Sequence, residues 1–393
     1  MRQDGRAMNG LLAVISRDWV GLPIALLVGG AGAWSLGLSG TWARVIGGIV
    51  VAVAVLMVLG SVRHLVCLAQ VRAKCPPPGR LVDVGGYRMH VLVEGESATK
   101  PTVVWLPGGH ASGHEFHRLH AVLRETTRSV LVDRPGSGWS DVGPFPRTTA
   151  TEAVELFTAL ERAGLDGPFV LVGHSFGGLL AANAARRRPE LVAGLVLLDP
   201  TPPDVIVYAM PNRSLTRSRA THLRAALCHL FGIHRGRGRG TDGPQGAVEP
   251  ARTPPACTTQ IDAFKTGSDC AAASIYSELS PIGMARRGWQ TVVYDGDLAD
   301  LRLLLVTPRD LTGGDEILDA VGDPVQAERL RRFYLNTRSR FLATSTRARR
   351  VYTPEGTGHN FPHEVPEFVT EVVRNLVDEI AEERRPPSSE PGG

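Results

Sequence analysis

Cysteine is scarce in this chain, with five residues among 393. Their number is odd and their spacing is irregular, which does not fit the pairing pattern of a disulfide framework. Cys67 and Cys75 lie close to an apolar segment, where acylation of a thiol is an alternative. We therefore expect Cys228, Cys257 and Cys270 to be free thiols in a reducing compartment.

Excess positive charge is missing from most of the chain. The formal net charge is +4; residues 1–80 alone contribute +6, from eight Lys or Arg and two Asp or Glu, which leaves −2 for the rest. Proteins that bind nucleic acid need a basic patch or stripe. The sequence therefore predicts no nucleic-acid partner, and we interpret the alternation of Arg and Gly at Arg235, Arg237 and Arg239 as a solvated linker.

A metal-binding pattern is missing as well. His110, His114, His117 and His120 would share one face of a helix, but no cysteine or carboxylate at metal-ligand spacing accompanies them. We interpret them as exposed or pocket-lining residues. Neither a metal ion nor another cofactor is expected.

Two long apolar stretches stand near the start of the chain. Residues 19–43 contain no charged side chain, and neither do residues 45–62. At about 1.5 Å per helical residue, each is long enough to cross a hydrocarbon core of about 30 Å, the second only just. Because a short segment separates them, we predict an anchor in residues 1–75, a transmembrane helical hairpin with spans at 19–41 and 45–66.

Basic residues flank this predicted hairpin on both sides. They are Arg2, Arg6 and Arg17 before it, and Arg63, Arg72, Lys74 and Arg80 after it. Because Lys and Arg accumulate on the cytoplasmic side of spans, both ends of the hairpin, and everything after residue 80, are predicted to be cytoplasmic. Two alternatives stay open: a leader cleaved near Ala31-Gly32-Ala33, and a buried hairpin in a soluble protein, which the apolar character of every face disfavours.

The rest of the chain alternates between strand and helix patterns. A hairpin is expected at 81–84 and 88–93, and further strands at 102–106, 129–132, 169–172, 194–198, 301–306 and 349–353. Helices are expected near 114–126, 149–163, 178–185, 324–342 and 365–382. Unbroken Val and Leu runs between helices predict an α/β fold, with a mostly parallel sheet covered by helices on both faces.

These patterns divide the chain after the anchor. The α/β core is expected to comprise residues 76–200 and 291–383, separated by an insertion at 201–290. The Gly-, Arg- and Pro-rich interval 232–256 predicts a mobile loop within the insertion. Residues 384–393 are rich in Pro, Ser and Gly and are expected to be disordered.

The pentapeptide Gly-His-Ser-Phe-Gly at 173–177 stands between a predicted strand and a predicted helix of small residues. A serine on such a sharp turn projects its hydroxyl out of the sheet, beside the free N–H groups of the helix. Glycine is needed on either side because a side chain there would collide with the neighbouring element. We therefore predict that Ser175 is a nucleophile.

Donors for a developing oxyanion are expected on two elements. The N–H group of Phe176, directly after the serine, is one. The other is expected from the glycine-containing turn after the strand at 102–106, where Gly109 or His110 presents its amide.

A serine hydroxyl also needs a base to accept its proton. The Gly-His sequence ending at His359 lies between the last predicted strand and the closing helix, which predicts His359 as that base; His363 is the alternative. A carboxylate should hold the imidazole in the correct tautomer. Asp310, after the strand at 301–306, is the expected acid and Asp199 the alternative. Further choices are Asp315 and Asp319.

From about Leu81 to Glu382 the chain resembles the α/β-hydrolase superfamily. It is most similar to the branch with the motif Asp-Arg-x-Gly-x-Gly-x-Ser-Asp, here residues 133–141. The Gly-His-Ser-x-Gly-Gly elbow, the strand ending in Leu-Leu-Asp-Pro and the late Gly-His followed by Pro366-Glu367 match as well. The resemblance implies that Ser175 is the nucleophile, His359 the base and 201–290 a lid over the pocket.

Two positions depart from the family pattern. Pro107-Gly108 stands where the family often has His-Gly before the oxyanion loop. At the acid, Thr307-Pro308-Arg309-Asp310 replaces the expected Gly-x-x-Asp. The second departure leaves the choice between Asp310 and Asp199 open.

Together these features predict a membrane-anchored serine hydrolase that cleaves a carboxylic ester through an acyl-enzyme on Ser175. A small-molecule or lipid-like ester is the expected substrate, since the anchor concentrates the enzyme at a bilayer. Serine at this position disfavours the relatives that use Asp to open epoxides or haloalkanes. The alternatives are a non-catalytic membrane-tethered binding or scaffold protein, and an acyltransferase or C–C hydrolase with the same triad.

Overall fold

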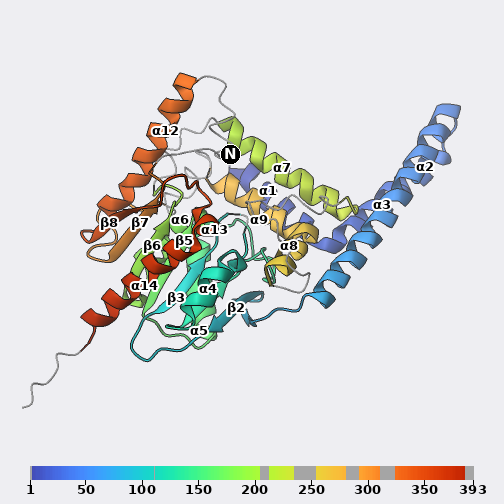
Figure 1. Cartoon of the computed structure of the whole chain (residues 1–393). Helices are drawn as coiled ribbons and strands as arrows, with labels where there is room; N and C mark the ends of the chain where they lie inside the picture. Colours follow the sequence, from blue (N-terminus) through green and yellow to red (C-terminus); the bar gives the residue numbers. More distant parts are fainter. Residues whose placement is uncertain are drawn as a thin grey trace, which may run out of the picture. The chain divides into compact units, whose positions relative to one another are not determined.

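The computed structural model describes residues 2–109, 111–203, 212–233, 254–279, 292–309 and 324–385. The chain divides into two compact units, whose elements are labelled in Figure 1. The helical unit comprises Met1–Pro78, Pro135–Arg147 and Pro211–Arg286, and the sheet unit comprises Gly79–Arg134, Thr148–Met210 and Arg287–Gly393. The predicted anchor and most of the predicted lid thus belong to one unit.

The sheet unit is built on one eight-stranded sheet with the order β1-β2-β4-β3-β5-β6-β7-β8. Its strands are β1 (Arg80–Asp83), β2 (Arg88–Glu94), β3 (Thr102–Leu106), β4 (Ser129–Val132), β5 (Phe169–His174), β6 (Val192–Leu198), β7 (Arg302–Thr307) and β8 (Ala348–Tyr352). Only the β1–β2 and β2–β4 pairs are antiparallel. The predicted mostly parallel sheet is confirmed, and with it the α/β class.

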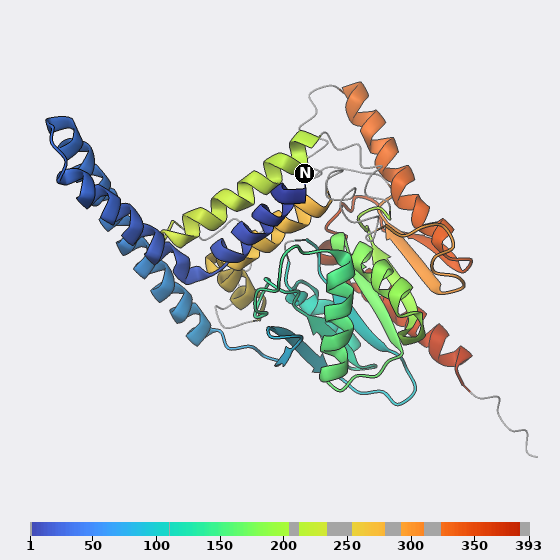
Figure 2. The same ribbon diagram turned by 180° about the vertical axis from the view of Figure 1, so that it is seen from behind.

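Helices cover both faces of this sheet. On one face, α4 (His117–Leu123) and α14 (Pro366–Glu383) bury Leu123 and Val373 in a cluster with Trp105 of β3 (Figure 1). On the other face lie α5 (Thr149–Arg162) and α6 (Phe176–Arg187), the green helices in front of the sheet in Figure 2. Every residue of β3, β4 and β5 is buried, as their continuous apolar sequences require.

The helical unit holds seven described helical segments. They are α1 (Arg2–Ile15), η1 (Asp18–Val20), α2 (Gly21–Leu36), α3 (Thr41–Lys74), α7 (Asn212–Leu230), α8 (Pro254–Phe264) and α9 (Thr266–Glu278). The helices α2 and α3 run side by side in both views (Figures 1 and 2). They approach closely at Gly32, where a Cβ atom would lie 2.9 Å from a Val50 methyl group. The predicted helical hairpin is therefore present.

Two segments of the hairpin, Asp18–Leu36 and Thr41–Lys74, are long and apolar enough to cross a membrane. Their large apolar side chains point outward: Leu27 is 76% exposed, Trp42 79% and Leu56 68%. A helical hairpin in the core of a soluble protein would bury such side chains. The exposure therefore disfavours the buried-hairpin alternative.

The second half of α3 is packed against protein. The Ser61 hydroxyl donates to the Leu230 carbonyl at 2.7 Å, and the carboxylate of Asp18 lies 3.4 Å from the buried His64 ring. Near the end of α3, Val71 packs with Ile261 of α8. The helix thus continues past the predicted span end at residue 66 and becomes part of the fold of its unit.

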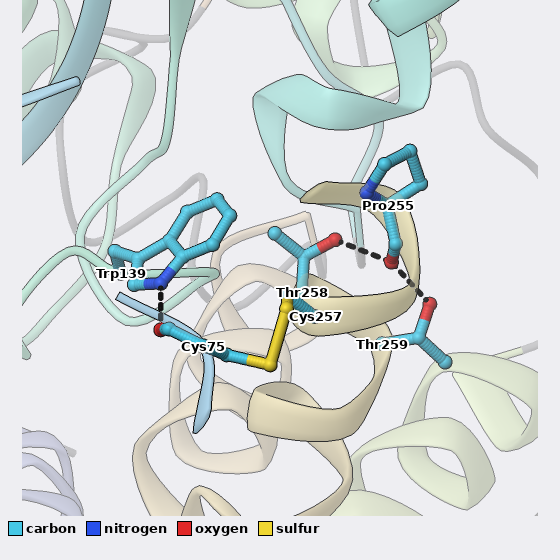
Figure 3. The surroundings of a disulfide bond; sticks show 6 residues. All are labelled: Cys75, Trp139, Pro255, Cys257, Thr258 and Thr259. Carbon is cyan, nitrogen blue, oxygen red and sulfur yellow. Dashed lines mark hydrogen bonds between the residues drawn. A yellow bond between two sulfur atoms is a disulfide. The ribbon is translucent and has the colours of Figure 1, made fainter. Parts of the chain in front are cut away.

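The prediction of free thiols was wrong for Cys257. Cys257 in α8 and Cys75, directly after α3, form a disulfide whose Cα atoms are 5.4 Å apart (Figure 3). The Trp139 indole donates to the Cys75 carbonyl at 2.9 Å beside it. Because the two cysteines are 182 positions apart, their spacing carries no sign of the pairing. The remaining three cysteines, Cys67, Cys228 and Cys270, are free.

Several sequence predictions concern residues outside the described part of the chain. They are His110, Asp310, Asp315 and Asp319, the Arg-Gly alternation, most of the loop expected at 232–256, and residues 386–393 of the expected tail. What was inferred for them stays a prediction.

Candidate active site

Ser175 occupies a sharp turn between β5 and α6. Its backbone has φ 53° and ψ −119°, a strained conformation for a residue with a side chain. A Cβ atom on Gly173 would overlap the Gly177 carbonyl, and one on Gly177 would overlap the Leu106 carbonyl. Glycine on both sides is therefore required by packing, as the sequence predicted for a nucleophile elbow.

His359 forms a hydrogen bond with Asp199. Its Nδ1 atom lies 2.6 Å from Oδ2 of Asp199, which is fully buried. Asp199 directly follows β6, and its own backbone is strained with φ 41°. The alternative acid of the sequence analysis is thus the carboxylate that the structure places on the imidazole.

The serine lies next to the same strand end. The N–H of Ser175 donates to Leu198, the last residue of β6, at 3.0 Å, and the Ser175 carbonyl accepts from Thr201 at 2.8 Å. The partners in these two bonds, Leu198 and Thr201, lie on either side of Asp199 in the sequence. Ser175 and Asp199 therefore sit at the carboxyl ends of adjacent parallel strands, where α/β sheets place their sites.

His174 connects the elbow to the loop that carries His359. The two imidazole rings are 4.7 Å apart between centroids, and Nε2 of His174 lies 3.0 Å from the His359 carbonyl. Burial, helped by the nearby charge of His359, lowers the pKa of His174 to about 3. The ring is therefore neutral, and its Nε2–H donates to the His359 carbonyl. Through this bond the loop is tied to the residue before the nucleophile.

Arg338 binds the other oxygen of Asp199. Its Nη1 atom lies 2.7 Å from Oδ1, and its side chain is only 6% exposed. Burial would raise the pKa of Asp199, but the charge of Arg338 and the bond to His359 outweigh it and hold that pKa below its ordinary value. Arg338 belongs to α12 (Pro324–Ser339), and no local motif marks it in the sequence.

The turn after β3 lies against the elbow. A Cβ atom on Gly108 would be 3.7 Å from the Ser175 Cβ, and one on Gly109 would be 3.9 Å from the Phe176 Cβ. The two backbones that were expected to supply oxyanion donors, at Gly109 and Phe176, are thus neighbours. Their closeness fits the geometry that a paired donor site requires.

Two charged side chains hold this turn. Glu115 accepts the Gly108 N–H at 2.8 Å, and Arg134 donates to the Gly108 carbonyl. The Arg134 guanidinium also lies 5.0 Å from the centre of the Phe176 ring. Arg134 thus contacts Phe176 itself and Gly108, the residue before Gly109. Burial raises the pKa of Glu115 to about 7, against the opposing effects of the Gly108 N–H, Arg134 and His359. Sequence reasoning missed Glu115.

Comparison with known proteins agrees with this architecture. A family model described as the alpha/beta hydrolase fold matches residues 101–241. Solved structures that share the fold include an epoxide hydrolase from Bacillus megaterium (TM-score 0.54, 16% identity, 76% of this chain and 100% of that one). An esterase from Exiguobacterium antarcticum is also similar (TM-score 0.51, 18% identity, 76% and 99%). The chain has the α/β-hydrolase fold.

Curated relatives of this α/β hydrolase match it over part of their length. An uncharacterised protein of Bacillus subtilis, YbdG, is 28% identical over 192 residues, which are 47% of this chain and 57% of YbdG. Lipase LipV of Mycobacterium tuberculosis is 38% identical over 114 residues, 28% of this chain and 41% of the lipase. The chain thus spans about half the length of these relatives, and the matches support an esterase- or lipase-like hydrolase.

One side-chain group in this α/β hydrolase has the composition of a metal site. Candidate ligand atoms of His90, His114 and Asp133, all buried, lie within 4.8 Å of one another. Two of these residues already have close polar neighbours: His90 Nε2 accepts the Gly79 N–H at 3.1 Å and its Nδ1 lies 3.0 Å from Asp133, which accepts the Gly113 N–H at 2.8 Å. Burial lowers the pKa of His114 to about 4, so that ring is neutral. We interpret the group as a structural network at the end of β4.

The histidines predicted to be exposed or pocket-lining have separate partners, and two of them, His114 and His120, are not exposed but buried. His117 Nδ1 lies 3.1 Å from the His114 carbonyl, whereas His120 bonds to Ser129 at 2.9 Å and Glu94 at 2.8 Å. The alternative base His363 lies 3.9 Å from Glu115. Among the described residues, the imidazole that bonds to Asp199 is that of His359.

Proposed function

We propose that this α/β hydrolase is a serine hydrolase that cleaves a carboxylic ester through an acyl-enzyme on Ser175. One observation carries the proposal: the imidazole of His359 is hydrogen-bonded to a buried carboxylate and tied by His174 to a serine on a strained elbow. This is the set of groups that nucleophilic acyl transfer needs.

The proposed reaction has two halves. Ser175 Oγ attacks the ester carbonyl carbon while His359 Nε2 takes its proton, and Asp199 stabilises the imidazolium that forms. The oxyanion accepts hydrogen bonds from the Phe176 and Gly109 amides. When the tetrahedral intermediate collapses, His359 gives the proton to the departing alcohol. Water then attacks the acyl-enzyme with His359 again as base. Collapse of the second tetrahedral intermediate releases the acid, while His359 returns the proton to Ser175 Oγ.

We propose Asp199 as the triad acid. Its 2.6 Å contact with His359, its full burial and its place at the carboxyl end of β6 support this assignment. Asp310, the acid expected from chain order, lies outside the described residues. A direct comparison of the two substitutions decides between them.

We also propose that α2 and α3 anchor the enzyme in a bilayer and that the ester is lipid-like. Support comes from their length, their apolar composition and the outward-facing Leu27 and Trp42. A bilayer would concentrate a lipid-like ester near the enzyme. The residues 201–290 remain a proposed lid. The flanking basic residues predict a cytoplasmic hydrolase domain.

Labelling with a fluorophosphonate probe tests the chemistry. We expect the full chain to be labelled, Ser175→Ala and His359→Ala to be unlabelled, and Ser97→Ala, in a surface turn, to match the wild type. A series of p-nitrophenyl esters of increasing chain length then measures substrate class. Labelling that persists in Ser175→Ala would overturn the proposed nucleophile, and no labelling of the wild type would favour the scaffold alternative.

A second candidate is acyl transfer to an acceptor other than water, or C–C bond hydrolysis. Both would use the same Ser175 and His359. Product analysis with an added alcohol separates transfer from hydrolysis, because transfer yields a new ester in place of the free acid.

A further inference from the structure

The site contains a charged residue beyond the nucleophile, base and acid. Arg338 and His359 bind the two oxygens of Asp199, at 2.7 and 2.6 Å respectively. The carboxylate is thus held from both sides, by a helix and by a loop that follow it by more than a hundred residues. A serine–histidine–acid mechanism does not require an arginine, so the ion pair of Arg338 with Asp199 needs a separate physical explanation.

Burial provides that reason. The Asp199 side chain has no exposed surface, and removing an ionised carboxylate from water is strongly unfavourable unless a counter-charge compensates. The charged or titratable groups that act on it among the described residues are Arg338, His359 and His174. His174 is neutral, and His359 is neutral whenever it serves as a base. Arg338 is therefore the group that supplies permanent positive charge.

Orientation is the second contribution. Asp199 has a backbone φ of 41°, a conformation that only surrounding contacts maintain. One oxygen is ion-paired with a guanidinium, and the other is directed at the imidazole. A planar guanidinium with several donors suits this task better than a flexible ammonium group.

From this arrangement we infer that Arg338 is a positioning residue of the active site, which keeps Asp199 ionised and directed at His359. The inference rests on the proposed function of the triad. It also identifies α12 as an active-site element, although that helix carries no hydrolase motif.

The test compares Arg338→Met and Arg338→Lys in the full-length protein. The control is Arg332→Met, since Arg332 lies in the same helix with a 78% exposed side chain. We measure kcat/KM for a soluble ester across the pH range. An arginine at this distance lowers the pKa of a carboxylic acid by about 1 to 3 units. Removing that charge favours protonation of the Asp199–His359 pair as a whole, so Arg338→Met should move the acidic limb of the profile to higher pH, while Lys retains most of the wild-type profile.

Two outcomes overturn the inference. One is an Arg338→Met profile that falls at every pH without moving along the pH axis, as a purely structural role would give. The other is an Arg338→Lys profile shifted as far as that of Met. Should Arg338→Met fail to fold, Arg338→Gln is measured in its place. Failure of the proposed function itself would be seen separately, as activity that survives in Ser175→Ala.

A second observation, the Cys75–Cys257 disulfide, concerns the compartment of the enzyme. Both cysteines are buried, 1% and 3% exposed, and the disulfide packs with Val71, Ile261 and Trp139. Structural disulfides form in oxidising compartments, whereas thiols in the cytosol are kept reduced. The disulfide therefore disagrees with the cytoplasmic orientation that the flanking charges predict.

Two of the seven basic residues behind that prediction have uses within the protein. Arg63 donates to the Gly232 carbonyl, and Arg72 lies 3.5 Å from Asp18. Their presence is thus explained by contacts of the helical unit without reference to membrane orientation. Among the described residues, no candidate span follows α3, so the described chain after Cys75 stays on one side of the membrane.

We infer that the enzyme faces an oxidising compartment, outside the cytoplasm. The test fuses alkaline phosphatase or green fluorescent protein to the C-terminus of the full chain in a bacterial host. The expected result is an active phosphatase and a dark fluorescent protein, because the first needs disulfides and the second does not mature after export through the general secretion pathway. A fluorescent fusion with inactive phosphatase would overturn the inference.

Thiol counting gives an independent readout on the same protein. A maleimide of defined mass should label three cysteines in the denatured, unreduced chain, since Cys67, Cys228 and Cys270 are free, and all five after reduction. Cys257→Ser should then yield four labels without reduction, and Cys67→Ser only two. Five labels on the unreduced wild type would overturn the inference, whatever the fusions show.

Discussion

The Nδ1 atom of His359 lies 2.6 Å from Oδ2 of Asp199, a residue 160 positions earlier in the chain. Asp199 directly follows β6, whereas the expected acid Asp310 comes after β7 in the sequence. A parallel sheet brings the carboxyl ends of both strands to the same edge, so either position is open to the acid of a hydrolase. A carboxylate after β6, the strand next to β5, can serve the reaction by itself, because the imidazole needs only one buried carboxylate on its Nδ1 atom.

Substitution of that carboxylate should be more damaging than substitution of Asp310. Asp199→Asn removes the charge and favours the wrong imidazole tautomer, which costs on the order of 10⁴ in kcat in a serine–histidine–aspartate triad. Asp310→Asn should lower kcat by less than about tenfold, because the imidazole needs one carboxylate and Asp199 already supplies it. Steady-state kinetics on the same ester measures both. A larger loss for Asp310→Asn would restore the acid first expected from chain order.

Glu115 should make stability depend on pH. Its pKa is raised from 4.5 to about 7 by burial, so the folded state holds a proton that the unfolded state releases. Stability is therefore complete below about pH 4.5 and falls as the pH rises through 7, by up to about 3 kcal/mol. Glu115→Gln keeps an acceptor for Gly108 without this cost. Unfolding in urea should show the variant more stable at pH 8 and nearly equal to the wild type at pH 5.

If the free energies of unfolding of Glu115→Gln and the wild type differed by the same amount at pH 5 and pH 8, this interpretation of Glu115 would be contradicted. Glu96→Gln is the matched control, because Glu96 is exposed. That variant should leave the free energy of unfolding unchanged at both pH values.

Loss of the disulfide should destabilise the protein. The bond joins residues 182 positions apart, and removal of a native disulfide costs about 2 to 5 kcal/mol. We expect Cys257→Ser to lower Tm in the absence of reductant, and Cys67→Ser to leave it unchanged. Reductant should lower the wild-type Tm toward that of Cys257→Ser. Equal Tm values for all three proteins would show that the disulfide does not contribute.

The elbow should tolerate no side chain at its last glycine. A Cβ atom at Gly177 would overlap the backbone of β3, whereas one at Gly109 would meet only ordinary contacts. Gly177→Ala should therefore lower the free energy of unfolding by more than the roughly 1 to 3 kcal/mol that overpacking typically costs. We expect a strongly reduced yield of folded protein. Gly109→Ala should fold normally. A folded, active Gly177→Ala protein would contradict the close approach of the two backbones.

Local patterns were sufficient to predict the sheet and its helices. Strands such as Thr102–Leu106 are continuous apolar runs between turn residues, and the elbow around Ser175 has a fixed local geometry. Arg338, Glu115 and the Cys75–Cys257 pair were not predicted. Arg338 and the cysteine pair depend on partners more than a hundred positions away. Glu115 has a near partner, Gly108, but no motif marks it. Long-range charge pairing and cross-linking follow from the fold, so a single sequence does not indicate them.

The length of α3 determines how this enzyme can be divided. The helix has 34 residues, about 51 Å at 1.5 Å per residue, which exceeds the thickness of a hydrocarbon core. Its last turns, with α1, cover apolar side chains of α7, α8 and α9, including Leu230 and Ile261. A protein shortened to begin at residue 80 would uncover those surfaces. The full chain is therefore the sound starting point for purified material.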